Sequence, residues 1–373
     1  MILKRKLNNI DFLILFLLGV LFFFIERKTL TKKPVKYYKL KEKSAVLTHK
    51  AFLLLKEEFI KRGGVIDSIN DPGKTGLIGL RSSLITEEEA ALETKLTSIN
   101  PNFSALFIDM FKKLNLKKGD YVGVSLNGSF PALNISLIIS AEVLGLKPII
   151  ITSLSSSAWG ANHHFWTYLD MENFLYEKKV IKTKTIAASL GGINDAGMGL
   201  EEEGRNILKK AIERNNIPIF INENSLERSI ERRVKIYDSL SNGNIKLFIS
   251  IGEVMADLGF SDMIYYLRSG INDPYDRKVD FNKLPVKGVI VRFLEKGIPV
   301  ISIHNIVAIA KKYNMPISPI EMPKACEGSL FFEEKYSIPL IILELFGLLF
   351  LLFLILRFDI NYILKKKKRE ESV

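Results

Sequence analysis

The chain has 373 residues, and 53 Lys and Arg against 41 Asp and Glu give it a formal net charge of +12. Hydrophobic residues make up 47% and charged residues 25%, a globular composition that excludes wholesale disorder and collagen-like sequence. The single cysteine, Cys326, excludes an internal disulfide framework and Cys-rich zinc motifs, and four histidines make a His-rich metal tract a poor interpretation. We therefore expect no metal and no cofactor.

The positive charge is unevenly distributed along the chain. Residues 1–43 hold eleven basic and three acidic residues, and residues 357–373 hold six basic and three acidic residues. The long middle part is nearly neutral. A nucleic-acid-binding domain would carry the excess on its folded part. Here the excess flanks two apolar segments, which indicates a membrane as the partner and not a nucleic acid.

The first apolar segment, Ile10–Ile25, is interrupted only by Asp11 and follows a cluster of basic residues. It is slightly shorter than the roughly 20 residues of a typical membrane span. A signal peptide is the competing interpretation. The segment runs directly into Glu26-Arg27-Lys28 without a small-residue cleavage site. This favours an uncleaved anchor, and we assign residues 1–28 to it.

The second apolar segment, Pro339–Phe358, is long enough to span a membrane and precedes the basic run Lys365–Arg369. We assign residues 337–373 to a transmembrane helix and a basic cytoplasmic tail. Glu344 lies inside the apolar segment, where a carboxylate is costly. It is expected either near the outer interface or against a partner helix in a complex.

The positive-inside rule places the Lys-rich end of the chain in the cytoplasm. Two spans then put both termini inside and the main domain outside the cytoplasmic membrane. The basic stretch that follows the first span, from Arg27 to Lys36, argues for the opposite orientation. Long domains, however, translocate largely regardless of local charge. We therefore expect an extracytoplasmic main domain.

Residues 29–119 are predicted to be a helical and irregular lead-in to this domain. Apolar spacing predicts helices over Ser44–Arg62 and Phe103–Leu114. Thr86, followed by three glutamates, resembles a helix N-cap with acids in the first turn. The Gly-Lys-Thr within Asp71–Gly76 lacks the spacing of a phosphate-binding P-loop.

Residues 120–336 show strands alternating with helices. Short apolar runs predict six buried strands: Tyr121–Leu126, Pro148–Thr152, Thr185–Leu190, Ile217–Ile221, Lys246–Ser250 and Ile298–Ile303. Helical patterns fall between or after them: Ala132–Leu144, Leu200–Asn215, Ser225–Leu240, Val286–Lys296 and His304–Tyr313. This alternation predicts an α/β domain with a mainly parallel sheet and helices on both faces, flanked by an N-terminal and a C-terminal transmembrane helix.

Ligands of open α/β sheets bind beyond the carboxyl ends of the strands. The loops there are rich in small and hydroxyl or amide residues, and the predicted ligand-binding residues are Asn127, Gly128, Ser129, Ser155, Ser156, Ser157, Gly191, Gly192 and Asn194. The first loop opens a helix, so its backbone N–H groups suit a phosphate or carboxylate. The alternative is an ordinary strand-to-helix turn in which the Ser129 hydroxyl only caps the helix.

Two catalytic interpretations remain open, although neither motif is complete. Ser129 could act as a nucleophile with His163, His164 or His304 as the base and Asp195 orienting it, but the G-x-S-x-G elbow is missing. The adjacent histidines, with Asp170 or Glu172, could bind a metal. Neighbouring side chains on one element point apart, however, which disfavours that site.

Two stretches of the chain resemble a known family. The first runs from Gly76 through Ser82–Glu93 to Phe103, and the second is the continuous segment Gly119–Asn134. Both resemble the bacterial poly-gamma-glutamate system protein family, and the similarity extends through Trp159–Asn162 and Gly191-Gly192. The resemblance implies work in the cell envelope or capsule beside a poly-γ-glutamate synthase, with an ATP-dependent amide ligase and small membrane subunits as partners. It carries no catalytic residues with it.

Three functional hypotheses follow from the residues and the resemblance together. The leading one is an accessory component of poly-γ-glutamate synthesis, export or anchoring that binds the carboxylates of this anionic polymer. The second is a hydrolase or transpeptidase acting on the polymer. The third is a scaffold whose membrane helices hold synthase subunits together. Whether the protein is an enzyme is left open.

Overall fold

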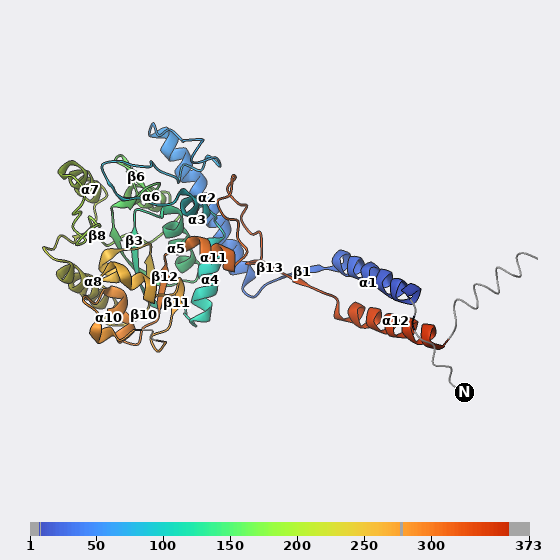
Figure 1. Cartoon of the computed structure of the whole chain (residues 1–373). Helices are drawn as coiled ribbons and strands as arrows, with labels where there is room; N and C mark the ends of the chain where they lie inside the picture. Colours follow the sequence, from blue (N-terminus) through green and yellow to red (C-terminus); the bar gives the residue numbers. More distant parts are fainter. Residues whose placement is uncertain (1–6, 8, 277–278, 358–373) are drawn as a thin grey trace, which may run out of the picture. The chain divides into compact units, whose positions relative to one another are not determined.

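The computed structural model describes residue 7 and residues 9–276 and 279–357. The chain divides into two compact units (Figure 1). The first combines residues 1–35 with 332–373, and the second is residues 36–331. The basic run Lys365–Arg369, on which the expected orientation depends, lies outside the described residues.

Two apolar helices dominate the first unit. Helix α1 (Asn9–Thr29) has 21 residues and α12 (Ile338–Arg357) has 20, and both are long and apolar enough to cross a membrane. The two helices contact each other. This confirms the prediction of two candidate spans by length and composition.

Glu344 lies on the face of α12 that is turned toward α1. Its side chain is buried, whereas most of the apolar side chains of α12 are exposed. Gly347, one turn further along, lies so close to α1 that a Cβ added there would sit 3.6 Å from the ring of Phe22. The carboxyl group of Glu344 lies close to that of Glu26. The chain's own first helix therefore covers this acidic residue.

A short antiparallel ribbon connects the two apolar helices to the rest of the chain. Strand β1 (Thr31–Pro34) pairs with β13 (Phe332–Lys335), and the register places Lys32 opposite Glu334 and Lys33 opposite Glu333. Opposite charges directly across an antiparallel pair are favourable. No apolar alternation marks this ribbon in the sequence, because its side chains are almost all exposed.

The second unit is built on a seven-stranded sheet with the order β11-β12-β10-β3-β4-β8-β9 (Figure 1). Its strands are β3 (Tyr121–Asn127), β4 (Lys147–Ser153), β8 (Ala187–Ser189), β9 (Ile219–Phe220), β10 (Ile245–Ile251), β11 (Gly270–Asn272) and β12 (Val300–Ile303). Neighbouring strands pair in parallel except for β11, which runs antiparallel to β12. The predicted α/β domain with a mostly parallel sheet is confirmed.

Helices and small strands complete this unit. The helices are α2 (Tyr38–Lys61), α3 (Leu92–Ser98), α4 (Phe103–Lys113), α5 (Pro131–Val143), α6 (Tyr168–Glu177), α7 (Glu202–Arg214), α8 (Leu226–Ser241), α9 (Met255–Leu258), α10 (Val289–Glu295) and α11 (Ile306–Lys312), with short 3₁₀ helices at Ser261–Tyr266 and Phe281–Lys283. Two small pairs are β2 (Thr86–Glu88) with β5 (Ser156–Ser157), and β6 (Asn162–His163) with β7 (Trp166–Thr167).

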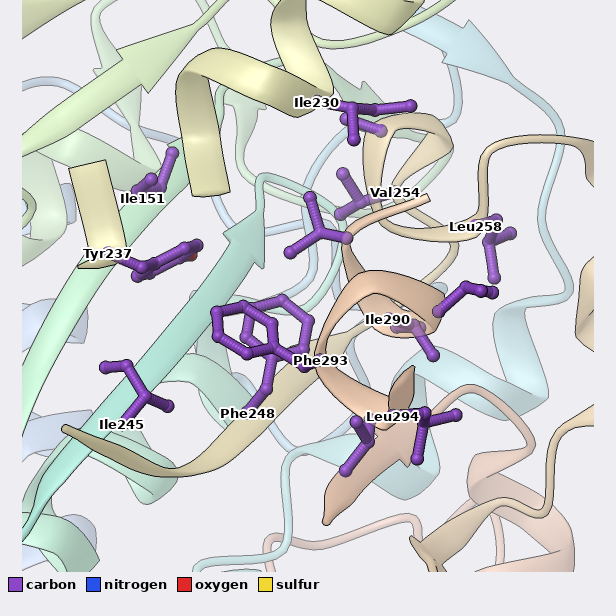
Figure 2. Packing of buried hydrophobic residues seen from close by; sticks show 14 of the residues in the cluster. Ile151, Ile230, Tyr237, Ile245, Phe248, Val254, Leu258, Ile290, Phe293 and Leu294 are labelled. Atoms are coloured by element: carbon purple, nitrogen blue, oxygen red, sulfur yellow. The ribbon is translucent and has the colours of Figure 1, made fainter. Parts of the chain in front are cut away.

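Apolar packing holds the helices to the sheet. Helices α2, α4 and α5 contact one another. A separate cluster joins α8, α9 and α10 to β10 and β12 (Figure 2). In this cluster Phe248 and Phe293 stack with their ring centroids 4.9 Å apart, and Tyr237 meets both rings edge-on. Aromatic pairs in these geometries stabilise the folded state beyond the contribution of their buried apolar area.

One predicted element is wrong. Thr86 does not cap a helix, because Thr86–Glu88 forms strand β2 and the next helix, α3, begins only at Leu92. Pairing with β5, about seventy residues away in the chain, outweighs the local capping pattern. The remaining predicted helices and strands are present with shifts of a few residues at their ends.

Candidate functional site

The order of the strands defines one position where ligands are expected. From β3 the chain builds β4, β8 and β9 on one side, and it then returns to place β10 and β12 on the other side of β3. Strands β3 and β10 are therefore neighbours from which the connections diverge. In open α/β sheets the crevice outside the carboxyl ends at such a switch point is the usual ligand site.

A cavity of about 120 Å³ lies at this switch point. Its lining comes from the ends of β2, β3, β4 and β10 and from the loop after β8: Glu87, Glu88, Asn127, Ser153, Gly192, Ile193, Asp195, Met198, Gly199, Glu253, Val254 and Met255. Four of these residues are acidic and none is Lys or Arg. The pocket is smaller than the 300–1,000 Å³ of a typical drug-sized ligand site. It therefore suits one small polar group.

Gly252 brings the two switch-point loops together. Its φ of +80° lies in the left-handed region, and a Cβ added to it would sit 2.3 Å from Nδ2 of Asn127. Only glycine meets both conditions without strain. The absence of a side chain at this position lets the Asn127 amide approach the loop that carries Glu253.

Glu87 and Glu88 are supplied by β2, which lies outside the main sheet. Both residues are exposed at the mouth of the pocket, but the carboxyl group of Glu87 packs against Gly192, whose hypothetical Cβ would lie 2.6 Å from Oε2. Loss of water around this carboxyl group raises the pKa of Glu87 to about 7. Partial loss of water around its carboxyl group, followed by the charge of Glu253, raises the pKa of Glu88, although the residue as a whole is exposed.

An ion pair beneath the pocket holds the loop after β8. Arg233 of α8 has no exposed surface and donates from Nε to Asp195 at 2.8 Å and from Nη2 to the other carboxylate oxygen at 2.9 Å. The Nη2 group also donates to the hydroxyls of Ser153 and Ser189. A buried charge is stable only when its hydrogen-bonding groups have partners in this way. Both carboxylate oxygens of Asp195 are therefore bonded to Arg233.

Lys95 of α3 forms a second buried polar contact next to Glu88. Its Nζ donates to the Ser157 hydroxyl at 2.7 Å and to the Ser129 carbonyl at 2.6 Å, and it lies 4.0 Å from the centroid of the Phe130 ring. Burial lowers the pKa of Lys95 to about 7, and the charge of Glu88 opposes this shift. The amine therefore exchanges its proton near neutral pH.

The predicted Asn127–Ser129 loop is occupied by contacts within the protein. The N–H of Gly128 donates to the Ser155 carbonyl, and that of Ser129 donates to Oδ1 of Asn127. The Ser129 hydroxyl does not cap α5, because it accepts the N–H of Ser157 and the helix begins after Phe130 without a side-chain cap. These donors are used internally, so the loop is a packed support for the pocket.

The other small residues of the prediction divide between the pocket and its support. Gly192 lines the pocket. The Ser155 side chain packs so closely against Gly191 that a Cβ at position 191 would not fit. The Ser156 hydroxyl donates to the Gly128 and Ser157 carbonyls. Gly191, Gly192 and Asn194 all have positive φ. The amide of Asn194 contacts the sulfur of Met198 at the pocket rim.

The three histidines considered as catalytic bases contact residues other than Ser129. His163 packs against the rings of Phe59 and Phe165, with centroids 5.0 and 5.5 Å away. His304 contacts the Ser302 hydroxyl through Nδ1 and lines a different cavity. His164 lies edge-on to Phe165. No described contact joins any of them to Ser129 or to Asp195, which is occupied by Arg233.

The residues considered for a metal have structural partners. Asp170 caps α6 through Thr167 and binds Arg214, and Glu172 accepts from the backbone and hydroxyl of Thr185. Among residues 9–276 and 279–357, no cluster of three or more His, Cys, Asp or Glu has the arrangement of a metal site.

Sequence reasoning did not single out Lys95, Arg233, Glu87 or Glu88 as site residues. Each of these charged residues lies in a segment whose local pattern is typical of a polar surface. Only contacts with residues distant in the sequence bring it into or beneath the pocket. Glu253 was recognisable as the residue that follows a strand end. Comparison of the chain with protein-family models, with curated proteins and with solved structures gave no significant match.

Proposed function

We propose that this protein is a membrane-tethered accessory component of poly-γ-glutamate synthesis, export or anchoring, and that the switch-point pocket binds the amino-terminal residue of the polymer. The resemblance of residues 76–103 and 119–134 to the poly-gamma-glutamate system protein family supports the first part. The two apolar helices are consistent with a tether to the cytoplasmic membrane. Synthase subunits embedded there would be the partners.

Only the amino-terminal end of a γ-linked polymer has the charges that suit this pocket. Each internal residue offers an α-carboxylate, which Glu88 and Glu253 would repel. The amino-terminal residue instead carries a free α-ammonium and an α-carboxylate on the same carbon. The ammonium would bind Glu88 and Glu253, while the carboxylate would accept hydrogen bonds from protonated Glu87 and the Asn127 amide. Charge-assisted bonds of this kind are the strong ones.

The observation that carries the proposal is the acidic lining of a small cavity at the switch point. We further infer that right-handed crossovers set α5 and α8 on opposite faces of the sheet, as in doubly wound domains. Helices would then cover both faces and leave the carboxyl edge open. With the domain outside the cytoplasmic membrane, that edge would meet polymer leaving the synthase.

The test uses γ-glutamyl methylamide, which has the terminal ammonium and α-carboxylate but no further carboxylates. Binding to the detergent-solubilised full chain is measured by calorimetry for the wild type and for Glu253→Gln. Losing one charged hydrogen-bond partner should weaken binding by roughly tenfold. The matched control is Glu213→Gln on the exposed side of α7. Equal affinity for the two variants would refute the proposal.

A second candidate function, hydrolysis or transpeptidation of the polymer, is favoured by the 2.7 Å contact between Lys95 Nζ and Ser157 Oγ. Neutral Lys95 would take the hydroxyl proton as Oγ attacks the amide carbon, and the same proton would pass to the amine as the C–N bond breaks. Water or an acceptor amine would then attack the Oγ ester and lose a proton to Lys95, which would return it to Oγ as the ester C–O bond breaks. Because Ser157 is buried, β2 would have to move to admit substrate. Ser157→Ala should abolish polymer shortening, and Ser82→Ala, at an exposed serine, should not. Retained cleavage by Ser157→Ala would exclude this nucleophile.

A further inference from the structure

A second cavity, separate from the switch-point pocket, lies beyond the carboxyl end of β12. It has a volume of about 500 Å³, which is within the range of ligand sites. Its lining comes from the end of α4, the segment around β11 and helix α11: Met110, Lys113, Leu267, Arg268, Ser269, Gly270, Ile271, His304, Asn305, Ala308, Ile309, Lys312 and Tyr313. Three of these residues are Lys or Arg and none is acidic.

The two lysines of this cavity surround one aromatic ring. The Nζ atoms of Lys113 and Lys312 lie 6.0 and 5.8 Å from the centroid of the Tyr313 ring. Within the described part of the chain, neither lysine forms an ion pair. The acid one turn before Lys113, Asp109, is paired with Lys41 at 2.7 Å. Within the described residues, both lysines therefore remain without an acidic partner at the cavity wall, one at the end of α4 and the other at the end of α11.

Neutral donors and one partly compensated cation complete the lining. Arg268 pairs with Asp276 at 2.5 Å, so it adds less net charge than the lysines. The Ser269 hydroxyl accepts the backbone N–H groups of His304 and Asn305, which ties the segment around β11 to the start of α11. Burial lowers the pKa of His304 to about 4, so its ring is neutral at pH 7 and offers hydrogen bonds without charge.

We propose that this cavity binds a ligand with several carboxylate groups, through Lys113 and Lys312. The volume exceeds that of a single small anion, and the two ammonium groups are contributed by different helices, so one extended ligand with spaced negative charges fits both. That this ligand is a γ-linked glutamate oligomer rests on the proposed function. The oligomer's internal carboxylates would occupy this cavity, whereas its terminal ammonium requires the acidic pocket.

The probe for this site is N-acetylated tetra-γ-glutamate, whose blocked amine cannot serve the acidic pocket. Its binding to the detergent-solubilised full chain is measured for Lys113→Ala/Lys312→Ala and for the matched control Lys117→Ala/Lys311→Ala. The control removes two exposed lysines of the same region that do not line the cavity. The cavity variant should bind at least about tenfold more weakly than the control.

Further arms separate the possible outcomes. Glu253→Gln should leave binding of the acetylated probe unchanged, so this proposal and the proposed function can fail independently. Inorganic phosphate should compete only weakly, because it fills a small part of the cavity; competition as strong as that of the tetramer would overturn the assignment to a polycarboxylate. Equal binding by the cavity and control variants would overturn the site itself. Thermal unfolding of both variants checks that each is folded.

Discussion

Arg233 is fully buried in a helix that looks like a surface helix in the sequence. Its neighbour Arg232 is of the same residue type and is exposed. Only packing across the sheet distinguishes them, because Arg233 reaches Asp195 and two serines from separate strand ends. Breaking such a pair by removing one partner leaves a buried charge and is strongly destabilising. No local pattern could have identified this residue as the support of the pocket.

Protonation of Asp257 should make the free energy of unfolding depend on pH. Its side chain is buried, and one carboxylate oxygen accepts a hydrogen bond from the Ser250 hydroxyl. Burial raises the pKa of Asp257 to about 6 from 3.8. The folded state therefore binds a proton that the unfolded state has already lost. This contribution to stability is fully present below about pH 4 and is lost as the pH rises toward 6.

Replacing Asp257 with Asn should remove this dependence while keeping the bond from Ser250. Relative to the variant, the wild type should lose about 2–3 kcal/mol of unfolding free energy between pH 4 and pH 7, from a shift of about two pKa units. Denaturant unfolding at several pH values measures the difference. Asp262→Asn, at an exposed site, controls for loss of one carboxyl group. Parallel pH profiles for wild type and Asp257→Asn would contradict the account.

The elements that the sequence predicts well are those whose signal is local. The apolar run of β3 and the spacing of α4 are buried almost throughout, so burial and periodicity coincide. Strand β2 was missed because its pairing with β5 is distant in sequence. Strand β11 has only three residues and is antiparallel, which gives too short a pattern to read. The β1–β13 ribbon is exposed and has no apolar alternation at all.

The β1–β13 ribbon offers a direct test at the scale of elements. Lys32 and Glu334 are register partners across the antiparallel pair. Their Cα atoms should therefore be about 4.5–5.5 Å apart, within the range for a disulfide. In a Cys326→Ser background, Lys32→Cys with Glu334→Cys should cross-link rapidly under mild oxidation, as measured by gel shift after proteolysis between the two positions.

The control for this pair is Lys32→Cys with Glu333→Cys, which is off by one residue. Successive residues of a strand point to opposite faces, so this pair should form little disulfide. Equal cross-linking of the two pairs would mean that the register, or the ribbon itself, is wrong.

At the scale of the whole molecule, the sequence located the edge of the sheet but not the chemistry found there. Strand ends place Asn127, Gly192 and Glu253 near one another because parallel strands share a carboxyl edge. Glu87 and Glu88 of β2 line the same pocket from outside the sheet. Because of these two carboxyl groups, the pocket is acidic, whereas the sequence predicted a site that binds anions. Tertiary pairing of this kind is not encoded in any local window.

The orientation in the membrane is a second prediction for the whole molecule. Basic residues flank both apolar helices, and we expect both chain ends in the cytoplasm and residues 36–331 outside. Protease added to intact spheroplasts should digest the middle of the chain and spare epitope tags at both ends. Protection of the middle, with digestion only after lysis, would reverse the orientation and remove the domain from the path of exported polymer.

The central claim is that the switch-point pocket recognises the terminal ammonium of a γ-glutamyl chain. The most direct measurement compares γ-glutamyl methylamide with its N-acetyl derivative on the wild-type protein at pH 7, by calorimetry. Acetylation removes the positive charge and leaves the α-carboxylate in place. We expect the free amine to bind and the acetylated compound to bind at least about tenfold more weakly. Equal or tighter binding of the acetylated compound would contradict the claim.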